Sequence, residues 1–227
     1  MRIDVAFTPG EGLAAASLAI VVDVLRATST IAQALAAGYE RVLCAAEVDE
    51  AMRLRETVPG SLVGGEREAR RIEGFDVGAS PREFLEPRAA TLILSTTNGT
   101  RAILSAAAQA DEVVLGSLLN LDAVTGYAVE RGGDVAVVCA GFKSAFALDD
   151  AYCAGRIVAL LGGERSDAAL AAELVAGSFP TALEGLNART YGPPGLEEDI
   201  AFCARESVLD VVPRLSRMVG KAAEIVA

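Results

Sequence analysis

Short apolar segments alternate with longer amphipathic or alanine-rich segments through the first two thirds of the chain. Continuous apolar runs, typical of strands buried on both faces, occupy residues 19–22, 91–95 and 134–139. Further strands are predicted at 2–7, 41–45 and 112–116, and helices at 28–37, 48–56, 102–110 and 123–131. This alternation predicts an α/β fold, a three-layer α/β/α sandwich with a largely parallel or mixed sheet.

The pattern changes in the last third of the chain. Successive helices are predicted at 167–177, 180–189 and 196–205, with Pro193-Pro194 as a hinge between the last two. A short strand at 209–212 and a final helix at 213–226 follow. At 227 residues and 52% hydrophobic, the chain is long enough for one large core or two small ones. We predict a single domain over 1–227, with a helical C-terminal elaboration at 165–205 on one side of the sheet.

Composition limits the partners and the compartment. The formal net charge of −11 argues against nonspecific binding to nucleic acid or to anionic membranes. The longest apolar stretch, 13–22, is too short to span a bilayer, and the first residues lead directly into a strand without the apolar centre of a signal peptide. We therefore expect a cytoplasmic protein whose four cysteines, in apolar segments without C-x-x-C spacing, are reduced and buried.

Histidine is absent from the 227 residues, which restricts the available chemistry. Its absence excludes a Ser-His-Asp triad, a phosphohistidine nucleophile and histidine-ligated zinc. Catalysis would have to use carboxylates, hydroxyls, arginine or a metal bound by oxygen. Because the chain is acidic, any anionic substrate must be held by local cations, and arginine suits bidentate capture of phosphate, sulfonate or carboxylate.

Polar turns follow three of the predicted strands. The strand at 19–22 ends on Asp23 and Arg26, the strand at 91–95 leads into the turn 96–101, and the strand at 134–139 leads towards Lys143 and a helix that opens on Asp149-Asp150. In open α/β sheets, ligands bind beyond the carboxyl ends of the strands, so the three turns are expected to meet at one crevice. The alternative is that these residues only form turns and helix caps.

The residue types in these turns suggest a hard metal ion and an anion as ligands. Asp23 is the first candidate metal ligand and, with Arg26, the candidate catalytic residue; Glu66, Asp76 and Asp150 are further candidate metal ligands. Each has a purely structural alternative, as a turn former or, for Asp150, as an acid at a helix N-terminus. The candidate substrate-binding residues are Thr28, Ser29, Arg67, Thr97, Asn98, Gly99, Thr100, Arg101 and Lys143.

The same residues occur in a series of motifs that spans nearly the whole chain. In order these are Asp23-Val-Leu-Arg26-Ala-Thr28-Ser29-Thr30, Gly64-Gly65-Glu66-Arg67, Gly74-Phe75-Asp76-Val77-Gly78 with Ser80-Pro81, Thr96-Thr97-Asn98-Gly99-Thr100-Arg101, Cys139-Ala140-Gly141, Leu148-Asp149-Asp150 with Cys153-Ala154-Gly155, and Asp199-Ile200 with Phe202-Cys203-Ala204. In this combination the chain resembles the magnesium-dependent 2-phosphosulfolactate phosphatases of coenzyme M biosynthesis. The resemblance implies an α/β sandwich with a mixed sheet and Mg²⁺ as cofactor. It also implies hydrolysis of the 2-phosphate of a small three-carbon acid, giving sulfolactate and phosphate.

Several alternatives stay open at this point. The nucleophile is either a metal-activated water or Asp23 itself, and the water is favoured because Leu25 stands where a D-x-D phosphatase has its second acid. The alternative substrate is a related acid such as phospholactate. Two alternatives to hydrolysis also stay open: noncatalytic binding of a phosphometabolite, and a Mg²⁺-dependent lyase or phosphotransferase reaction on a related acid. The oligomeric state is also open, a homodimer included, because alanine-rich helices can pack closely against a second copy.

Overall fold

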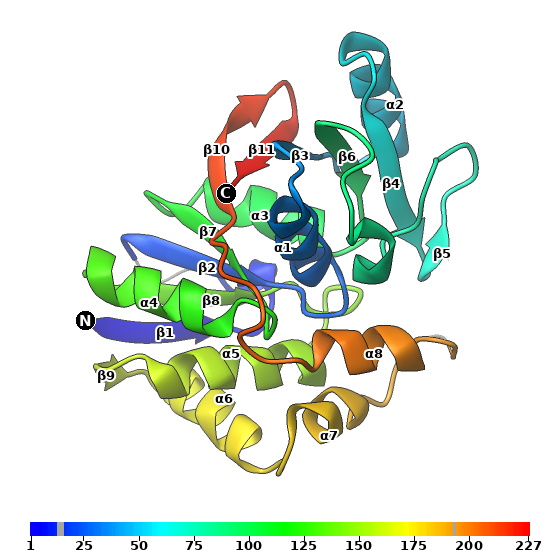
Figure 1. The fold of residues 1–227 in the computed structure, drawn as a ribbon. Coiled ribbons are helices and arrows are strands. Elements are labelled where there is room, and N and C mark those ends of the chain that lie inside the picture. Colours follow the sequence, from blue (N-terminus) through cyan, green and yellow to red (C-terminus); the bar gives the residue numbers. More distant parts are fainter. Residues whose placement is uncertain (13–15, 193) are drawn as a thin grey trace.

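The computed structural model describes residues 1–12, 16–192 and 194–227, and within them eleven strands form one sheet (Figure 1). The strands, in chain order, are β1 (Arg2–Ala6), β2 (Leu18–Val22), β3 (Arg41–Cys44), β4 (Leu62–Arg67), β5 (Arg70–Arg71), β6 (Thr91–Ser95), β7 (Val113–Gly116), β8 (Val135–Cys139), β9 (Glu164–Arg165), β10 (Arg214–Val219) and β11 (Ala222–Val226). The helices are α1 (Ala27–Ala37), α2 (Val48–Thr57), α3 (Gly99–Ala107), α4 (Leu121–Arg131), α5 (Leu148–Leu160), α6 (Asp167–Gly177), α7 (Ala182–Asn187) and α8 (Glu197–Cys203).

The sheet consists of two parallel parts joined by an antiparallel hairpin. Its order is β5-β4-β6-β3-β11-β10-β7-β2-β8-β1-β9. β4, β6 and β3 are parallel neighbours, as are β7, β2, β8, β1 and β9. The β10–β11 hairpin pairs antiparallel with β7 on one side and β3 on the other. The predicted α/β class with a mixed sheet is confirmed.

The C-terminal hairpin corrects the sequence prediction of a helix at 213–226. Gly220, at φ +62°, begins the two-residue turn between β10 and β11, a position that favours glycine. β11 pairs in the middle of the sheet, so strand pairing and burial override the helical propensity of its alanines. The predicted strand at 209–212 is also wrong, because this segment runs beside the β7–α4 connection without joining the sheet; the Leu209 N–H donates to the Leu119 carbonyl.

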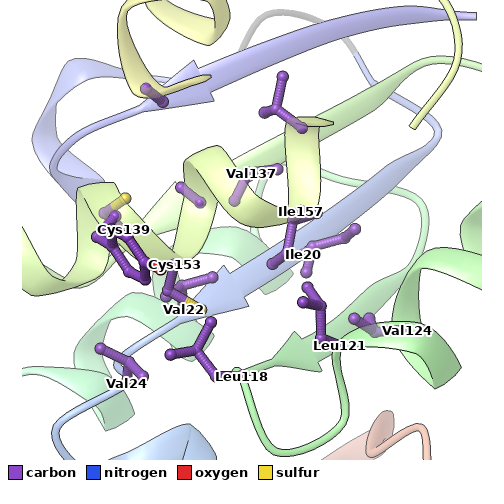
Figure 2. Packing of buried hydrophobic residues seen from close by; sticks show 14 of the residues in the cluster. Ile20, Val22, Val24, Leu118, Leu121, Val124, Val137, Cys139, Cys153 and Ile157 are labelled. Atoms are coloured by element: carbon purple, nitrogen blue, oxygen red, sulfur yellow. The ribbon is translucent and has the colours of Figure 1, made fainter. Parts of the chain in front are cut away.

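Both faces of the sheet are covered by helices, and β2 lies between the two resulting cores. All five β2 residues are fully buried, which confirms the expectation for its apolar run. On one face Ile20 and Val22 pack against α4 and α5, where Val124 and Ile157 contribute (Figure 2). On the other face, residues of β2 pack in a second cluster with apolar residues of α1 and α3. This burial fixes the carboxyl end of β2. Asp23 is the first residue after that end.

Three short helices, α6 to α8, form the expected elaboration beside α5 (Figure 1). α6 has the predicted bounds and packs closely on α5, because a Cβ on Gly155 would lie 2.0 Å from the Ala172 carbonyl oxygen. α7 and α8 are shorter than predicted, and Pro193 of the predicted hinge lies outside the described residues. No helix in the described parts of the chain combines the length and apolar character needed to cross a bilayer.

Candidate active site

A cavity of about 400 Å³ lies at the carboxyl ends of β2, β4, β6 and β8. The polar turns after β2, β6 and β8 meet there, together with the β4–β5 turn and the segment between α7 and α8. Its charged lining residues are Asp23, Arg26, Glu66, Glu68, Lys143, Asp149 and Arg189. Polar turns on neighbouring parallel strands therefore share one concave site, as expected of an open α/β sheet.

Asp23 lies where β2 ends, and the first turn of α1 holds its position. Its Oδ1 accepts from the Ala27 N–H at 3.3 Å. The Thr28 hydroxyl donates to the Asp23 carbonyl at 2.9 Å and accepts from the Asp23 N–H at 3.1 Å. Burial raises the pKa of Asp23 to about 7; the Ala27 N–H opposes this rise, and the nearby Glu66 and Asp149 add to it. A bound cation would therefore strongly favour the ionised form of the Asp23 side chain.

Two further buried acids, Asp149 and Asp150, open α5. Asp149 Oδ1 accepts from the Asp150 N–H at 3.0 Å and from the Tyr191 hydroxyl. Asp150 accepts from the Val24 N–H at 2.9 Å and from the Gly141 N–H at 3.0 Å, one with each carboxylate oxygen. Burial raises the pKa of both acids. Asp150 thus joins the turns after β2 and β8, whereas Asp149 faces the main cavity.

The acids at this end of the cavity fit an open site for a hard divalent cation. Asp23, Asp149 and Asp150 line a small hollow of about 20 Å³ beside the main cavity. Among the described residues no group of three or more acids or cysteines is arranged to hold a metal ion by itself. Mg²⁺, however, usually keeps several waters and takes one or two carboxylates plus substrate oxygens. Asp23 and Asp149 suit that role, since both oxygens of Asp150 already accept from backbone N–H groups.

Glu66, at the end of β4, connects two of the segments that line the cavity. Its Oε1 accepts from the N–H and hydroxyl of Thr97 at 2.9 Å and 3.0 Å, and its Oε2 accepts from the Ala69 N–H at 2.7 Å. Glu66, Thr97 and the neighbouring Asn98 line the cavity. Thr97 uses its donors on Glu66, so its contribution is to position that carboxylate.

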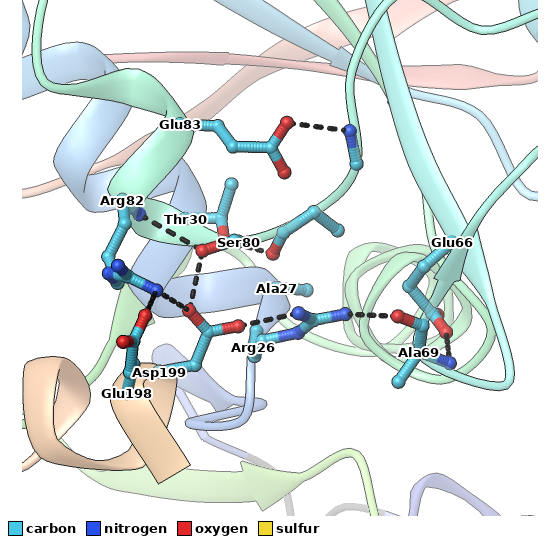
Figure 3. Close-up of polar contacts among 12 residues, drawn as sticks. Arg26, Ala27, Thr30, Glu66, Ala69, Ser80, Arg82, Glu83, Glu198 and Asp199 are labelled. Atoms are coloured by element: carbon cyan, nitrogen blue, oxygen red, sulfur yellow. Dashed lines mark hydrogen bonds and ion pairs between the residues drawn. The ribbon is translucent and has the colours of Figure 1, made fainter. Parts of the chain in front are cut away.

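Arg26 is a cation of the site whose guanidinium is held by contacts on two sides (Figure 3). Its Nη1 donates to Asp199 Oδ2 at 2.6 Å and its Nη2 donates to the Ala69 carbonyl at 3.2 Å. The Arg26 and Asp199 side chains are only 9% and 7% exposed. The Ser80 hydroxyl in turn donates to Asp199 Oδ1 at 2.5 Å. The guanidinium is therefore held between α8 and the β4–β5 turn, at the cavity wall.

Several residues predicted to bind substrate instead stabilise the turns. Thr28 and Ser29 are fully buried, and their hydroxyls donate to the Asp23 and Val24 carbonyls. Thr100 is paired with Thr96 at 3.1 Å. Thr28, Ser29 and Thr100 do not line the cavity. The physical reason is that hydroxyls at a helix start satisfy the backbone groups of their own turn.

Three charged candidates also lie away from the cavity lining. Arg67 donates to the Ala46, Glu66 and Ser95 carbonyls and so ties neighbouring strand ends together. The side chain of Arg101 is 65% exposed and lies 3.5 Å from Glu47. The predicted metal ligand Asp76 accepts from Arg55 at 3.0 Å and from the Val63 N–H at 2.9 Å. These contacts give Asp76 a structural role in its loop.

Gly99 contributes to the site through its lack of a side chain. A Cβ at this position would lie 2.4 Å from Ala27 Cβ and 2.5 Å from Asp23 Oδ2. The close approach places the N-terminus of α3, with its partial positive charge, beside the Asp23 carboxylate. Gly99 is thus a packing residue that positions Asp23.

Gly99→Ala is therefore expected to displace Asp23, lower turnover about tenfold and destabilise the fold by about 1–3 kcal/mol through overpacking. Gly126→Ala is the matched control, since its added Cβ meets nothing within 4 Å and lies within α4. It should stabilise the protein by about 0.5–1 kcal/mol. Urea unfolding measures the change in stability and the turnover rate measures the displacement of Asp23; equal behaviour of the two variants would contradict the assignment.

The sequence-based selection omitted four residues that build the site. Either acid of the Asp149-Asp150 pair could supply a metal ligand by its position, but only Asp150 was selected, and Asp199 was identified only as part of a motif. Arg189 and Tyr191 belong to the connection between α7 and α8, which follows no strand of the sheet. The lack of a strand-to-helix turn there left no sequence signal for these two residues.

Comparison with known proteins identifies relatives over nearly the full chain. The sequence model of the family described as 2-phosphosulpholactate phosphatase matches residues 7–218. A probable 2-phosphosulfolactate phosphatase from Carboxydothermus hydrogenoformans is 40% identical over 94% of this chain and 92% of its own length. Proteins of the same description from Thermus thermophilus and Thermotoga maritima are each 37% identical, over 98% of both chains for the first and over 87% of this chain and 88% of its own for the second.

Proposed function

The chain belongs to the 2-phosphosulfolactate phosphatase family, and from that premise we propose that it hydrolyses 2-phospho-3-sulfolactate to 3-sulfolactate and phosphate, with Mg²⁺ as cofactor. The observation that carries the proposal is the pair of buried carboxylates, Asp23 and Asp149, in one cavity with Arg26. Phosphoryl transfer depends mainly on positioning and on neutralising phosphoryl oxygens, which this combination can supply.

Asp23 and Asp149 would hold the Mg²⁺ ion. When bound, the ion supplies neutralisation of phosphoryl charge and activation of water. The two carboxylates are rigidly placed, one by the first turn of α1 and one by the Asp150 N–H and the Tyr191 hydroxyl. Asp150 and Glu66 support these positions through backbone N–H groups from neighbouring segments.

Arg26 would hold the phosphoryl oxygens while water attacks the phosphorus atom. A bond forms between phosphorus and the water oxygen, and the bond from phosphorus to the C2 oxygen breaks. A proton reaches the departing oxygen, so the products are the hydroxy acid and phosphate. Because its other contacts are with Asp199 and the Ala69 carbonyl, the guanidinium is preorganised for this role.

A noncatalytic binding protein for the same ligand is the alternative of a different class. Such a protein gains nothing from burying Asp23 and Asp149, because two carboxylates repel an anionic ligand. A Mg²⁺-dependent lyase or phosphotransferase on a related acid shares the site's features and is separated by its products. The net charge of −11 disfavours nucleic acid as a partner. The proposed partner is a small anionic substrate, held by the local cations of the cavity. A cytoplasmic location, a role in coenzyme M biosynthesis and a homodimer complete the proposal.

The test is phosphate release from 2-phospho-3-sulfolactate and 2-phospholactate, measured in parallel with Mg²⁺ and with EDTA. We expect rapid release from the sulfonate substrate with Mg²⁺ and loss of at least about 1,000-fold in EDTA, because the paired acids cannot bind phosphate without a cation. Release from 2-phospholactate alone would reassign the substrate. No release from either compound by folded protein in Mg²⁺ would contradict the proposed hydrolysis.

A further inference from the structure

Arg189 differs from the other cations of the cavity in its partners. Arg26 is paired with Asp199 at 2.6 Å, and Lys143 Nζ lies 4.0 Å from Glu68 Oε1. Arg189 lines the same cavity, and its Nη1 donates to the Tyr191 carbonyl at 2.7 Å. Within the described ranges it has no carboxylate within ion-pair distance. It therefore brings a positive charge into the cavity that no direct ion pair neutralises.

The local backbone holds this guanidinium in place. Gly192 has φ +97°, and a Cβ on it would lie 2.2 Å from Arg189 Nη1. The absence of a side chain at residue 192 thus leaves the space that the guanidinium occupies. With Nη1 fixed on the Tyr191 carbonyl, the remaining donors of the planar fork are left for a ligand.

The same turn is connected to the acids at the other end of the cavity. The Tyr191 ring stacks on Phe142, with centroids 4.5 Å apart and planes inclined by 22°. Its hydroxyl donates to Asp149, the proposed cation ligand. Tyr191 therefore links the proposed phosphate end of the cavity to Arg189.

We propose that Arg189 determines substrate specificity by binding the second oxyanion of a 2-phospho acid, the carboxylate or the sulfonate. This inference rests on the proposed function. The cavity is lined by four acids, Asp23, Glu66, Glu68 and Asp149, which repel any further anionic group on the substrate. A compact acid whose phosphate lies near Asp23 and Arg26 needs a separate cation for its other charge. Arg189 is placed to supply that cation, with a fork suited to carboxylate and sulfonate oxygens.

The test compares Arg189→Gln and Arg189→Lys with the unchanged protein on three substrates. Each carries its phosphate on the middle carbon of a three-carbon chain. These are 2-phospho-3-sulfolactate, 2-phospholactate and isopropyl phosphate, which carry two, one and no additional acid groups. Loss of a charge-assisted contact should raise KM for 2-phospho-3-sulfolactate about 30-fold in Arg189→Gln, with a smaller rise in Arg189→Lys and little change in kcat. A rise confined to that substrate assigns the sulfonate, and an equal rise for 2-phospholactate assigns the carboxylate. An equal loss on isopropyl phosphate, or no loss on any substrate, would overturn the proposal.

Binding without turnover separates this inference from the proposed hydrolysis. Calorimetry measures Kd for 3-sulfolactate and lactate with the unchanged protein, Arg189→Gln and Arg53→Gln, the last a control at an exposed arginine on α2. We expect at least one acid to bind about 30-fold more weakly to Arg189→Gln and equally to Arg53→Gln. If no phosphate were released from any substrate, the hydrolysis would fail while this binding difference still supported Arg189. Unchanged binding, or no binding of either acid to the unchanged protein, would overturn the role of Arg189.

Discussion

Asp23→Asn is expected to lower phosphate release by at least about 1,000-fold while making the metal-free protein more stable at pH 8. The loss of activity follows from the position of Asp23, which ends β2 at the cavity and is held by the Ala27 N–H and by Thr28. Asparagine keeps the shape of the side chain but removes the charge that would bind the cation. The same substitution removes a charge that the fold has to bury.

The stability change follows from the raised pKa of Asp23. Burial raises that pKa from 3.8 to about 7, so the folded protein holds a proton between these values that the unfolded chain has released. Stability in EDTA should therefore be highest below pH 3.8, as far as this group is concerned, and fall as pH rises to about 7. At pH 8 the charged form costs up to about 4 kcal/mol. Asp23→Asn escapes that cost.

Thermal unfolding in EDTA at pH 6 and pH 8 measures the effect. Asp23→Asn should unfold about 5–10 °C above the unchanged protein at pH 8, with a smaller difference at pH 6. Asp210→Asn, at an exposed acid outside the cavity, serves as the control and should change neither stability nor turnover. A folded Asp23→Asn protein with full turnover would sink the catalytic assignment, and lower stability at pH 8 would contradict the burial argument.

Asp199→Asn should reduce kcat/KM at least about 100-fold although Asp199 does not line the cavity. Its carboxylate positions Arg26 through the 2.6 Å contact and is itself held by Ser80. Asparagine keeps a similar size but leaves the buried guanidinium without its anionic partner. Because removal of one partner from a buried ion pair costs about 3–5 kcal/mol at most sites, some loss of stability should accompany the loss of activity.

Glu198→Gln is the matched control for this positioning role. Glu198 is the preceding residue on α8, its side chain is 76% exposed, and it pairs with Arg82 at the surface. Its substitution should leave turnover and unfolding nearly unchanged. The decisive readout is inhibition by inorganic phosphate, which should weaken with Asp199→Asn if Arg26 holds phosphoryl oxygens. Unchanged inhibition together with a lowered melting temperature would indicate only a structural role.

The alternation of apolar strands and polar turns was sufficient to predict the architecture and part of the site. It placed Asp23, Arg26, Asn98 and Lys143 after strand ends, and the structure brings these residues around one cavity. Glu66 was selected from its glycine-rich turn alone, and the strand before it, β4, was not predicted. The end of a strand can be recognised from the local sequence, and in a parallel sheet the carboxyl ends of neighbouring strands lie at the same edge. The sequence therefore predicts which of these residues lie close together. The hydroxyls were misjudged because sequence does not show whether a donor is already used by the local backbone.

The remaining errors concern contacts between distant segments. Arg189 and Tyr191 reach the cavity, and Asp199 reaches Arg26 at its wall, because the α6–α8 segment packs beside α5 and the strand ends. The C-terminal hairpin was predicted as a helix because its alanines favour one locally, whereas its conformation is set by pairing with β3 and β7. Tertiary packing decides both cases, and a single sequence contains little direct signal for it.

The position of the β10–β11 hairpin has a consequence for how the site is assembled. Residues of the β4–β6–β3 part supply Glu66 and Thr97, whereas the β7–β2–β8 part supplies Asp23 and the turn before Asp149. Among the described strands, only the hairpin joins these parts within the sheet, by pairing residues 223–225 with residues 42–44 and Arg214 with Val114. Such pairing has high contact order, so closure of the sheet should be a slow folding step. Until it occurs, β3 and β7 expose unpaired edges that can recruit strands from other chains.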